Sequence, residues 1–253
     1  MSRAALQIYR TFLRQANRMS KRGVELEIQK PVSDNWGHYG YSESGLAYQA
    51  SAMSQLLGSS LRIFPGAEKL DAAALRRVLR ENFKLNKVAS PVETPRLMGE
   101  AMAALRVLLE QLYLHRCSST STTEGVRIDA TSKFSTAATA YGRSQNLFSY
   151  RIRITNLRSE PIQVLGREWS ILNDKGAIMV HVPHVSGNAI VGQQPIIPPN
   201  DCFEYISGTD LDTPSGLQRG FLEIAVLDNG RPARTFMATV KPFVHMRPDV
   251  HRS

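Results

Sequence analysis

The sequence predicts an α+β protein of two domains, a helical domain followed by an antiparallel β-sandwich. Hydrophobic residues recur at helical spacing up to residue 117 and at alternate positions from residue 126, and a run of Ser and Thr separates the two patterns. A chain of 253 residues is long enough for two hydrophobic cores. We therefore expect a helical domain at 1–117, a linker at 118–125 and a sandwich domain at 126–245.

Three segments of the first domain have the periodicity of helices. The first segment combines an apolar face with a basic stripe: Leu6, Tyr9, Leu13 and Ala16, with Phe12 and Met19 beside them, and Arg10, Arg14 and Arg18. The second begins at Asp71, a favoured N-cap residue, and ends before Asn86. The third begins at Thr94 and Pro95 and stays apolar to Leu112. The intervening segment, 24–70, is interpreted as an insertion that includes a short helix over 44–57.

The second domain consists of short strand-like segments separated by turn sequences. Polar and apolar residues alternate in Tyr150–Thr155, and Trp169 is expected in the core. About seven such segments without a helix are typical of an antiparallel β-sandwich. The segments lie at 126–132, 150–155, 162–171, 177–182, 202–206, 220–227 and 235–240.

Charge and cysteine content limit the classes of function. The net charge is +9, and residues 1–117 account for most of it, with 17 Lys and Arg against 10 Asp and Glu. Such a domain attracts acidic partners, whether nucleic acid, anionic lipid or acidic protein. Cys117 and Cys202 are too far apart for a disulfide framework or a thiolate metal site, which favours a reducing compartment. Arg106 and Glu110 interrupt the longest apolar stretch, so no membrane span is expected.

Motifs in two of the helices resemble the LYR-motif family, small mitochondrial three-helix proteins related to accessory factors of respiratory complex I. Ile8-Tyr9-Arg10 stands where that family has Leu-Tyr-Arg. The second helix contains Arg80-Glu81-Asn82-Phe83-Lys84, followed by Lys87 and Pro91-Val92-Glu93, which looks like the family's Arg-x-x-Phe-Arg/Lys pattern and the entry to its third helix. Ile8 in place of Leu and the insertion 24–70 are departures from the family.

The resemblance implies a partner, the mitochondrial acyl carrier protein. Its 4′-phosphopantetheine arm and fatty acyl chain would enter the bundle, so the cofactor would be carried by the partner and none bound directly. An acidic carrier and its phosphodiester require a cluster of cations. The residues expected to bind the carrier and its arm are Tyr9, Arg10, Arg14, Arg80, Lys84 and Lys87. Those expected to line an acyl-chain channel are Ile8, Leu13, Leu79, Phe83, Met98, Met102 and Leu105.

The first 24 residues contain six Lys or Arg and no acidic residue, a composition also typical of mitochondrial transit peptides. Cleavage after residue 20 would remove the motif helix. We therefore expect this segment to direct the protein to the mitochondrial matrix without being removed.

Motifs of the second domain resemble the ApaG family in the expected order, from Val126 to about Val244. They are Tyr150-x-Ile-x-Ile-x-Asn156, Arg167-x-Trp169, Gly192-Gln-Gln-Pro195, Phe203-Glu-Tyr-Ile-Ser-Gly208 and Leu211-Asp-Thr-Pro-Ser-Gly216. The resemblance implies a fibronectin-type-III-like (immunoglobulin-like) sandwich that serves as a protein-interaction module. Bacterial members have a Gly-x-Gly-x-x-Gly loop suggested to hold pyrophosphate. Here Ala189 replaces the middle glycine and no helix follows, so nucleotide chemistry is not expected.

Together these patterns predict a non-catalytic mitochondrial adaptor, because the sequence shows neither a catalytic constellation nor a metal-ligand set. The helical domain would bind acylated carrier protein, and the ApaG domain would dock on a large matrix complex as an assembly factor or accessory subunit. Overall basicity slightly favours the mitochondrial ribosome, with contact to ribosomal RNA, over a respiratory complex. An RNA-binding module that stacks bases on Trp36, Tyr39 and Tyr41 is the alternative from another class. An enzyme acting on a phosphorylated nucleotide through the sandwich is the least favoured.

Overall fold

The computed structural model divides the chain into two compact units. The helical unit comprises Met1–Lys30 and Gln49–His115, and the sandwich unit comprises Pro31–Tyr48 and Arg116–Ser253. Within them the structure describes residues 2–29, 32–33, 37, 39–41, 69–140, 143–190 and 192–249. The helix expected at 44–57 and Trp36 lie outside these residues.

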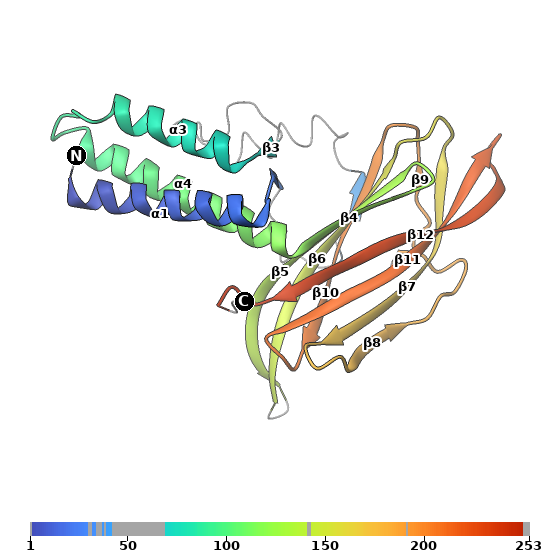
Figure 1. The fold of residues 1–253 in the computed structure, drawn as a ribbon. Coiled ribbons are helices and arrows are strands. Elements are labelled where there is room, and N and C mark those ends of the chain that lie inside the picture. The colour runs from blue at the N-terminus through green and yellow to red at the C-terminus, as the bar shows by residue number, and fades with distance from the viewer. Residues whose placement is uncertain are drawn as a thin grey trace. The chain divides into compact units, whose positions relative to one another are not determined.

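Within the described residues, three helices build the helical unit (Figure 1): α1 (Arg3–Arg22), α3 (Ala72–Leu85) and α4 (Thr94–Arg116). Asp71 caps α3 as expected, since its carboxylate accepts a hydrogen bond from the Ala74 amide at 2.6 Å. Gly23 ends α1 in the left-handed conformation, with φ of +62°. No described helix is long and apolar enough to cross a bilayer.

The apolar face of α1 is rotated from the expected one. The residues buried on α1 are Ile8, Phe12, Ala16 and Met19, whereas Leu6, Tyr9 and Leu13 are half-buried. The rotation has a physical cause: the apolar arc of α1 is wide, and the bulky Phe12 and Met19 are fully enclosed by residues such as Leu75 and Leu108. Leu6, Tyr9 and Leu13 are left at the margin of the core.

The residues that follow α1 are tied to the bundle by a small sheet and by one side chain. β1 (Leu26–Glu27) pairs with β3 (Lys69–Leu70). Gln111 of α4 is buried, and its amide accepts from the Gln29 backbone N–H and donates to the Gln29 carbonyl, both at 2.8 Å. The side chain thus satisfies backbone groups as a neighbouring strand would.

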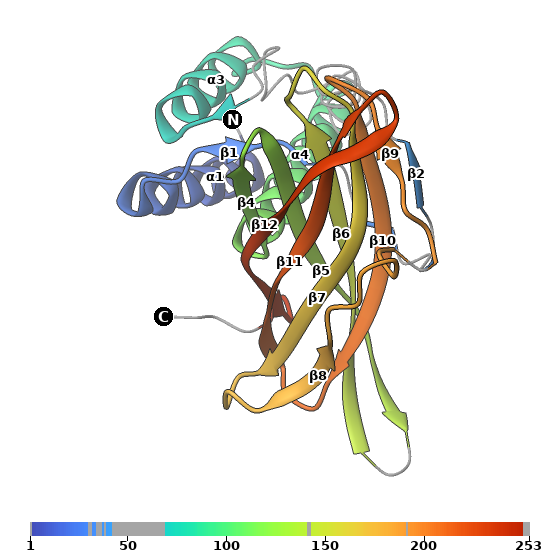
Figure 2. The same ribbon diagram turned by 90° about the vertical axis from the view of Figure 1, so that its right-hand side faces the viewer.

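Two five-stranded sheets form the sandwich, and the layer of β12, β11 and β7 can be followed in Figure 2. One sheet has the order β2-β10-β6-β5-β4, and the other has the order β12-β11-β7-β8, with β9 also pairing with β7. The strands are β2 (Tyr39–Tyr41), β4 (Ser118–Thr123), β5 (Val126–Ala140), β6 (Arg143–Asn156), β7 (Ile162–Asn173), β8 (Ile178–Val182), β9 (Ile196–Ile197), β10 (Cys202–Leu211), β11 (Ser215–Asp228) and β12 (Arg231–Met246). All seven expected segments are strands, and Trp169 is buried in the core between the sheets.

The linker expected at 118–125 is wrong, because residues 118–123 are strand β4. β4 pairs with β5 through the turn at Glu124 and Gly125, both with positive φ. Its hydroxyl groups find partners, since Ser119 and Ser121 donate to carbonyl oxygens of β12 at 2.7 and 2.5 Å. A run of Ser and Thr looks like a linker by composition, but threonine favours strands.

Part of the segment 24–70 belongs to the sandwich and not to the helical domain in which an insertion was expected. Its residues Tyr39–Tyr41 form β2, which pairs with β10 and extends the first sheet of the sandwich. Gly37 continues this contact through its N–H, which donates to the Ile206 carbonyl at 3.0 Å. The sandwich therefore includes a strand that precedes α3 and α4 in the sequence, and its last strand, β12, ends at Met246.

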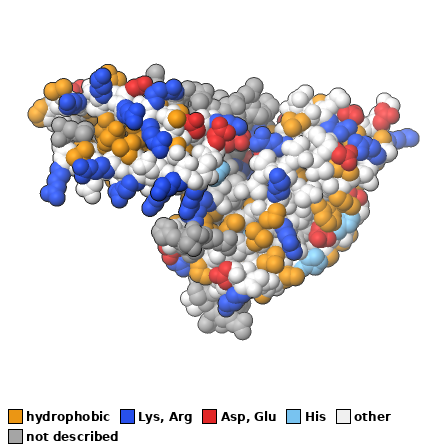
Figure 3. Space-filling view, viewed as in Figure 1, with side chains coloured by type: hydrophobic (Ala, Val, Ile, Leu, Met, Phe, Trp, Pro, Cys, Tyr) orange, Lys and Arg blue, Asp and Glu red, His pale blue; other side chains and the backbone are white. Residues whose placement is uncertain are grey.

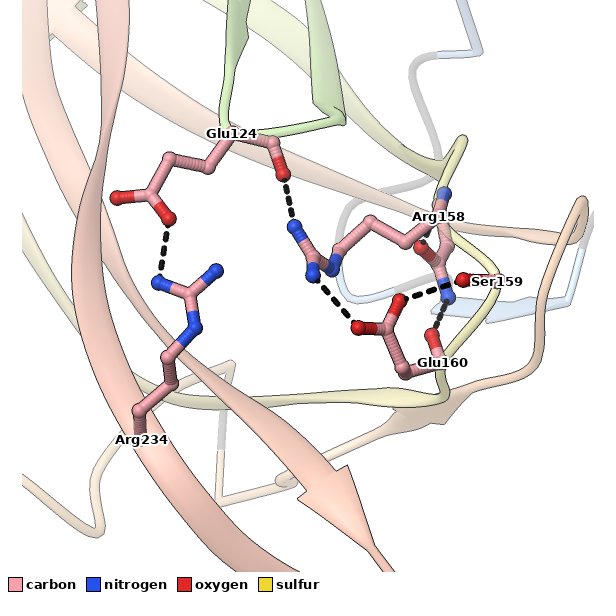
Figure 4. Close-up of polar contacts among 6 residues, drawn as sticks. Glu124, Arg158, Ser159, Glu160 and Arg234 are labelled. Atoms are coloured by element: carbon pink, nitrogen blue, oxygen red, sulfur yellow. Dashed lines mark hydrogen bonds and ion pairs between the residues drawn. The ribbon is translucent and has the colours of Figure 1, made fainter.

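One end of the sandwich is held by a polar network (Figure 4). The Arg158 guanidinium donates to the Glu124 carbonyl at 2.6 Å and pairs with Glu160 at 2.9 Å. Glu124 in turn pairs with Arg234 of β12 through its carboxylate. The network joins the β4–β5 turn to the β6–β7 loop and to β12. Two neighbouring segments therefore hold the turn of this hairpin in place.

Replacement of Gly220 tests the close approach of β11 to β7. A Cβ atom at Gly220 would overlap the Glu168 carbonyl and lie 2.9 Å from Trp169 Cε3. We expect Gly220→Ala to lower the free energy of unfolding of the sandwich by about 3 kcal/mol or more, because strained overpacking of this size requires backbone shifts. Gly99→Ala in α4 has open space and should instead stabilise by about 1 kcal/mol. Denaturant titration followed by circular dichroism would measure both changes in the free energy of unfolding. Equal changes in the two variants would contradict a close approach of β11 to β7 at Gly220.

His245 provides a second test of the sandwich core. It is fully buried among Phe148, Tyr150 and Phe243, and its ring bonds Ser132 at 2.7 Å and Gln218 at 3.1 Å. Burial lowers the pKa of His245 to about 3. In the unfolded chain the His245 imidazole therefore binds a proton below about pH 6.5, whereas in the folded chain it stays neutral down to about pH 3.

The free energy of unfolding should accordingly fall by up to about 1.4 kcal/mol per pH unit between pH 6.5 and 3 on account of His245. His245→Gln should remove this part of the pH dependence while keeping polar groups toward Ser132 and Gln218. His181→Gln, on the exposed strand β8, serves as the control and should keep it. If both variants followed the wild-type pH dependence, the buried neutral imidazole would be refuted.

Candidate functional site

A ring contact joins α1 to α3 at the margin of the bundle core. The ring centroids of Tyr9 and Phe83 lie 4.9 Å apart at an angle of 53°. Farther along the same two helices, Arg76 of α3 donates to the Asn17 side chain of α1 at 3.0 Å. These two contacts define antiparallel helices, which brings Arg80 to the level of Leu13, while Lys87, beyond the end of α3, lines one cavity with Ala5.

Basic side chains surround this apolar contact. Arg10, Arg14, Arg80, Lys84 and Lys87 are all exposed, and within the described chain none of them forms an ion pair. Arg14 donates instead to the Thr11 hydroxyl at 2.9 Å. Figure 3 shows hydrophobic side chains grouped on this side of the helical unit with Lys and Arg around them. We call this surface the α1–α3 face: Tyr9, Arg10, Leu13, Arg14, Arg80, Phe83, Lys84 and Lys87.

Not all residues expected to line a channel lie together. Ile8, Leu79 and Leu105 are buried in the bundle core, and Leu13, Phe83 and Met98 pack against that core half-buried. Met102 does not belong with them, because its side chain is 43% exposed. The buried face of α4 instead runs through Ala101, Leu105 and Leu108, and Met102 lies a rotation of about 100° away from Ala101.

A cavity of about 210 Å³ opens where the N-terminal end of α1 meets the α3–α4 turn. Phe83 and Met98 line it, as do residues that the sequence did not single out, among them Ala5, Leu97 and Ala101. Asn82, Asn86 and Lys87 add polar groups. The side-chain amides of Asn82 and Asn86 donate to carbonyls one turn back, at 2.9 Å each, which leaves their oxygens as acceptors toward a ligand.

These additional residues had a weak signal in the sequence. Leu97 and Ala101 are four residues apart, so they share one face of α4 with Leu105. That spacing predicts a common face but does not show whether neighbours fill it. Ala5 and the two asparagines could not be identified before the helices were placed side by side.

The glycine-containing loop of the sandwich uses its own polar groups. Gly187 donates its N–H to the Leu165 carbonyl at 2.8 Å, and the Arg167 guanidinium donates to the Ala189 carbonyl. Ala189 and Ile190 are fully buried in the sandwich core. The described centre of the loop thus packs into the sandwich core.

The histidines of the sandwich surface have separate partners. His184 bonds Glu223 of β11 at 2.9 Å, while His181 lies 3.4 Å from the Ser170 hydroxyl. Within the described ranges no three or more His, Cys, Asp or Glu side chains gather as metal ligands would.

Comparison with known proteins identifies the second half of the chain. The ApaG domain family model matches residues 137–225. Protein ApaG of Xanthobacter autotrophicus is 32% identical over 130 residues, which cover 51% of this chain and 94% of the relative. Protein ApaG of Anaeromyxobacter dehalogenans is 39% identical over 125 residues, covering 49% and 92%. A Bordetella pertussis crystal structure bearing the name ApaA is 31% identical, covers 49% of this chain and 95% of that one, and has a TM-score of 0.42.

The match to the bacterial relatives takes in nearly their whole length but only about half of this chain. The family-matched residues lie within the sandwich and include β6, β7, β8 and β10. Through its C-terminal half, the chain belongs to the ApaG family.

Proposed function

We propose that the protein is a non-catalytic adaptor of the mitochondrial matrix whose α1–α3 face binds acylated mitochondrial acyl carrier protein. The Tyr9–Phe83 contact carries the proposal, because it brings the two motifs that resemble the LYR family onto one surface. Around that contact stand cations without ion-pair partners in the described chain. An acidic carrier with a phosphodiester offers the charges that such cations lack.

The cavity supports a role for the carrier's arm. Its apolar lining suits an acyl tail, its asparagine oxygens suit the N–H groups of a pantetheine amide, and Lys87 suits the phosphate. An engineered cavity of about 150 Å³ holds benzene, so a cavity of about 210 Å³ has room for only the first part of a fatty acyl chain. A longer chain would have to separate the helices and replace part of the core contacts of Phe83 and Met98.

The sandwich is proposed as the docking module for a large matrix complex, with the chain acting as assembly factor or accessory subunit. The net charge of +9 suits an RNA-rich particle and favours the mitochondrial ribosome over a respiratory complex. Sedimentation with ribosomal particles, as against co-migration with a respiratory complex on native gels, would separate the two clients.

An RNA-binding module remains the second candidate, because α1 carries six Lys and Arg and no acidic residue. Trp36 lies outside the described residues, and Tyr39 and Tyr41 are described only as backbone of β2. RNA binding that weakens with salt and survives Arg10→Ala would favour this candidate over carrier binding.

Charge reversal tests the α1–α3 face. We expect Arg10→Glu with Arg80→Glu to weaken capture of acylated carrier protein at least about tenfold, since one hydrogen bond to a charged group contributes roughly 1.5–3 kcal/mol. Arg106→Glu with Arg231→Glu, an equal change in charge at two exposed positions outside the α1–α3 face, should leave capture unchanged. Titration calorimetry or quantitative pull-down would show the difference. Equal loss in both variants would point to nonspecific charge attraction.

Filling the cavity tests the acyl-chain role. Met98→Trp should shift the acyl chains on captured carrier protein toward shorter lengths, because the larger side chain occupies space that the tail needs. Met102→Trp, on the exposed side of the same helix, is the matched control. Mass spectrometry of the captured carrier would report the chain lengths. An unchanged distribution in Met98→Trp would place the tail elsewhere.

A further inference from the structure

The turn between α3 and α4 exposes three large apolar side chains to solvent. Leu85 is 82% exposed, Val88 is 93% exposed and Val92 is 88% exposed. The other exposed large apolar side chains in the described ranges reach at most 64%. Turns between helices ordinarily carry polar residues, and nothing in the described bundle packs against these three. A cluster of this kind marks an interaction surface rather than a packing requirement.

Positive charge accompanies the cluster. Lys84 and Lys87 flank Leu85 and are exposed. The N-terminal end of α1, with Arg3, lies at the same end of the unit, since Ser2 and Ala5 line one cavity with Lys87. Figure 1 shows the start of α1 next to the α3–α4 turn.

The acidic groups nearby do not cancel this charge. The Glu93 carboxylate accepts from the Ser90 hydroxyl at 3.1 Å, and Glu100 is paired with Arg96. Glu81 lies one turn before Leu85 on α3. Arg3, Lys84 and Lys87 outnumber the two unpaired carboxylates, Glu81 and Glu93, so the tip carries an excess of positive charge.

Aliphatic side chains at the end of a hairpin, with lysines just behind them, fit one kind of surface. The aliphatic groups leave water for the boundary of the acyl region of a bilayer, while lysine stems extend the ammonium groups back to the headgroups. Anionic headgroups supply the complementary charge. A folded protein partner would instead need a pocket that accepts all three exposed side chains.

We propose that the α3–α4 turn inserts Leu85, Val88 and Val92 into the surface of an anionic lipid bilayer. This peripheral attachment requires no membrane-spanning helix. The three apolar residues lie outside the α1–α3 face, whereas Lys84 and Lys87 belong to both surfaces, so the test below changes only the apolar residues.

The test uses the full chain and vesicles of phosphatidylcholine, with and without phosphatidylglycerol. The variant Leu85→Ser, Val88→Ser, Val92→Ser removes the apolar tip. The matched control is Ile178→Ser, Val185→Ser, Ile196→Ser, three exposed apolar residues of the sandwich. Because all six side chains are exposed, both variants should fold, and thermal melts followed by circular dichroism verify that.

We expect the wild type and the sandwich variant to sediment with anionic vesicles and the tip variant to bind them at least tenfold more weakly. Emission of Val88→Trp should shift to the blue when anionic vesicles are added, whereas that of Val185→Trp should not. Failure of the wild type to bind vesicles would overturn the proposal. Equal binding by the tip and sandwich variants, or no shift for Val88→Trp, would also overturn it.

Discussion

The contact between the rings of Tyr9 and Phe83 is the constraint on which the functional account depends. It fixes the antiparallel alignment of α1 and α3 and holds their half-buried apolar residues at the edge of the bundle core. The helices could bury these rings more deeply only by turning their arginines and lysines inward, where unpaired charge is costly. The same contact therefore leaves apolar side chains half-buried between the exposed cations of the two helices.

The sequence predicted those elements whose local signals agree with their packing. Asp71 precedes an apolar helical pattern and caps α3, and Tyr150, Ile152 and Ile154 alternate and face the sandwich core. Resemblance to the ApaG family rested on several separated motifs, and the matched residues 137–225 confirm it. For the candidate site, the spacing within each helix predicted the basic stripe, because it depends only on the helical repeat.

The sequence alone could not predict which segments contact one another in the folded chain. Residues 118–123 have the composition of a polar linker, but hydroxyl groups among them donate hydrogen bonds to carbonyls of β12. Tyr39–Tyr41 form a strand by pairing with the edge of β10. Met102 and Ala101 are adjacent in an almost uniformly apolar stretch, so only the placement of α4 decides which of them is buried. The cavity next to Phe83 arises where three chain segments meet, which no single segment encodes.

We propose that the helical unit holds a carrier protein with its acylated arm. Native mass spectrometry of the complex purified from its own cells measures this most directly. We expect a one-to-one complex with a small acidic protein, whose mass on dissociation includes phosphopantetheine and a fatty acyl chain. Recovery of the chain alone, or with partners that carry no acylated arm, would contradict the account.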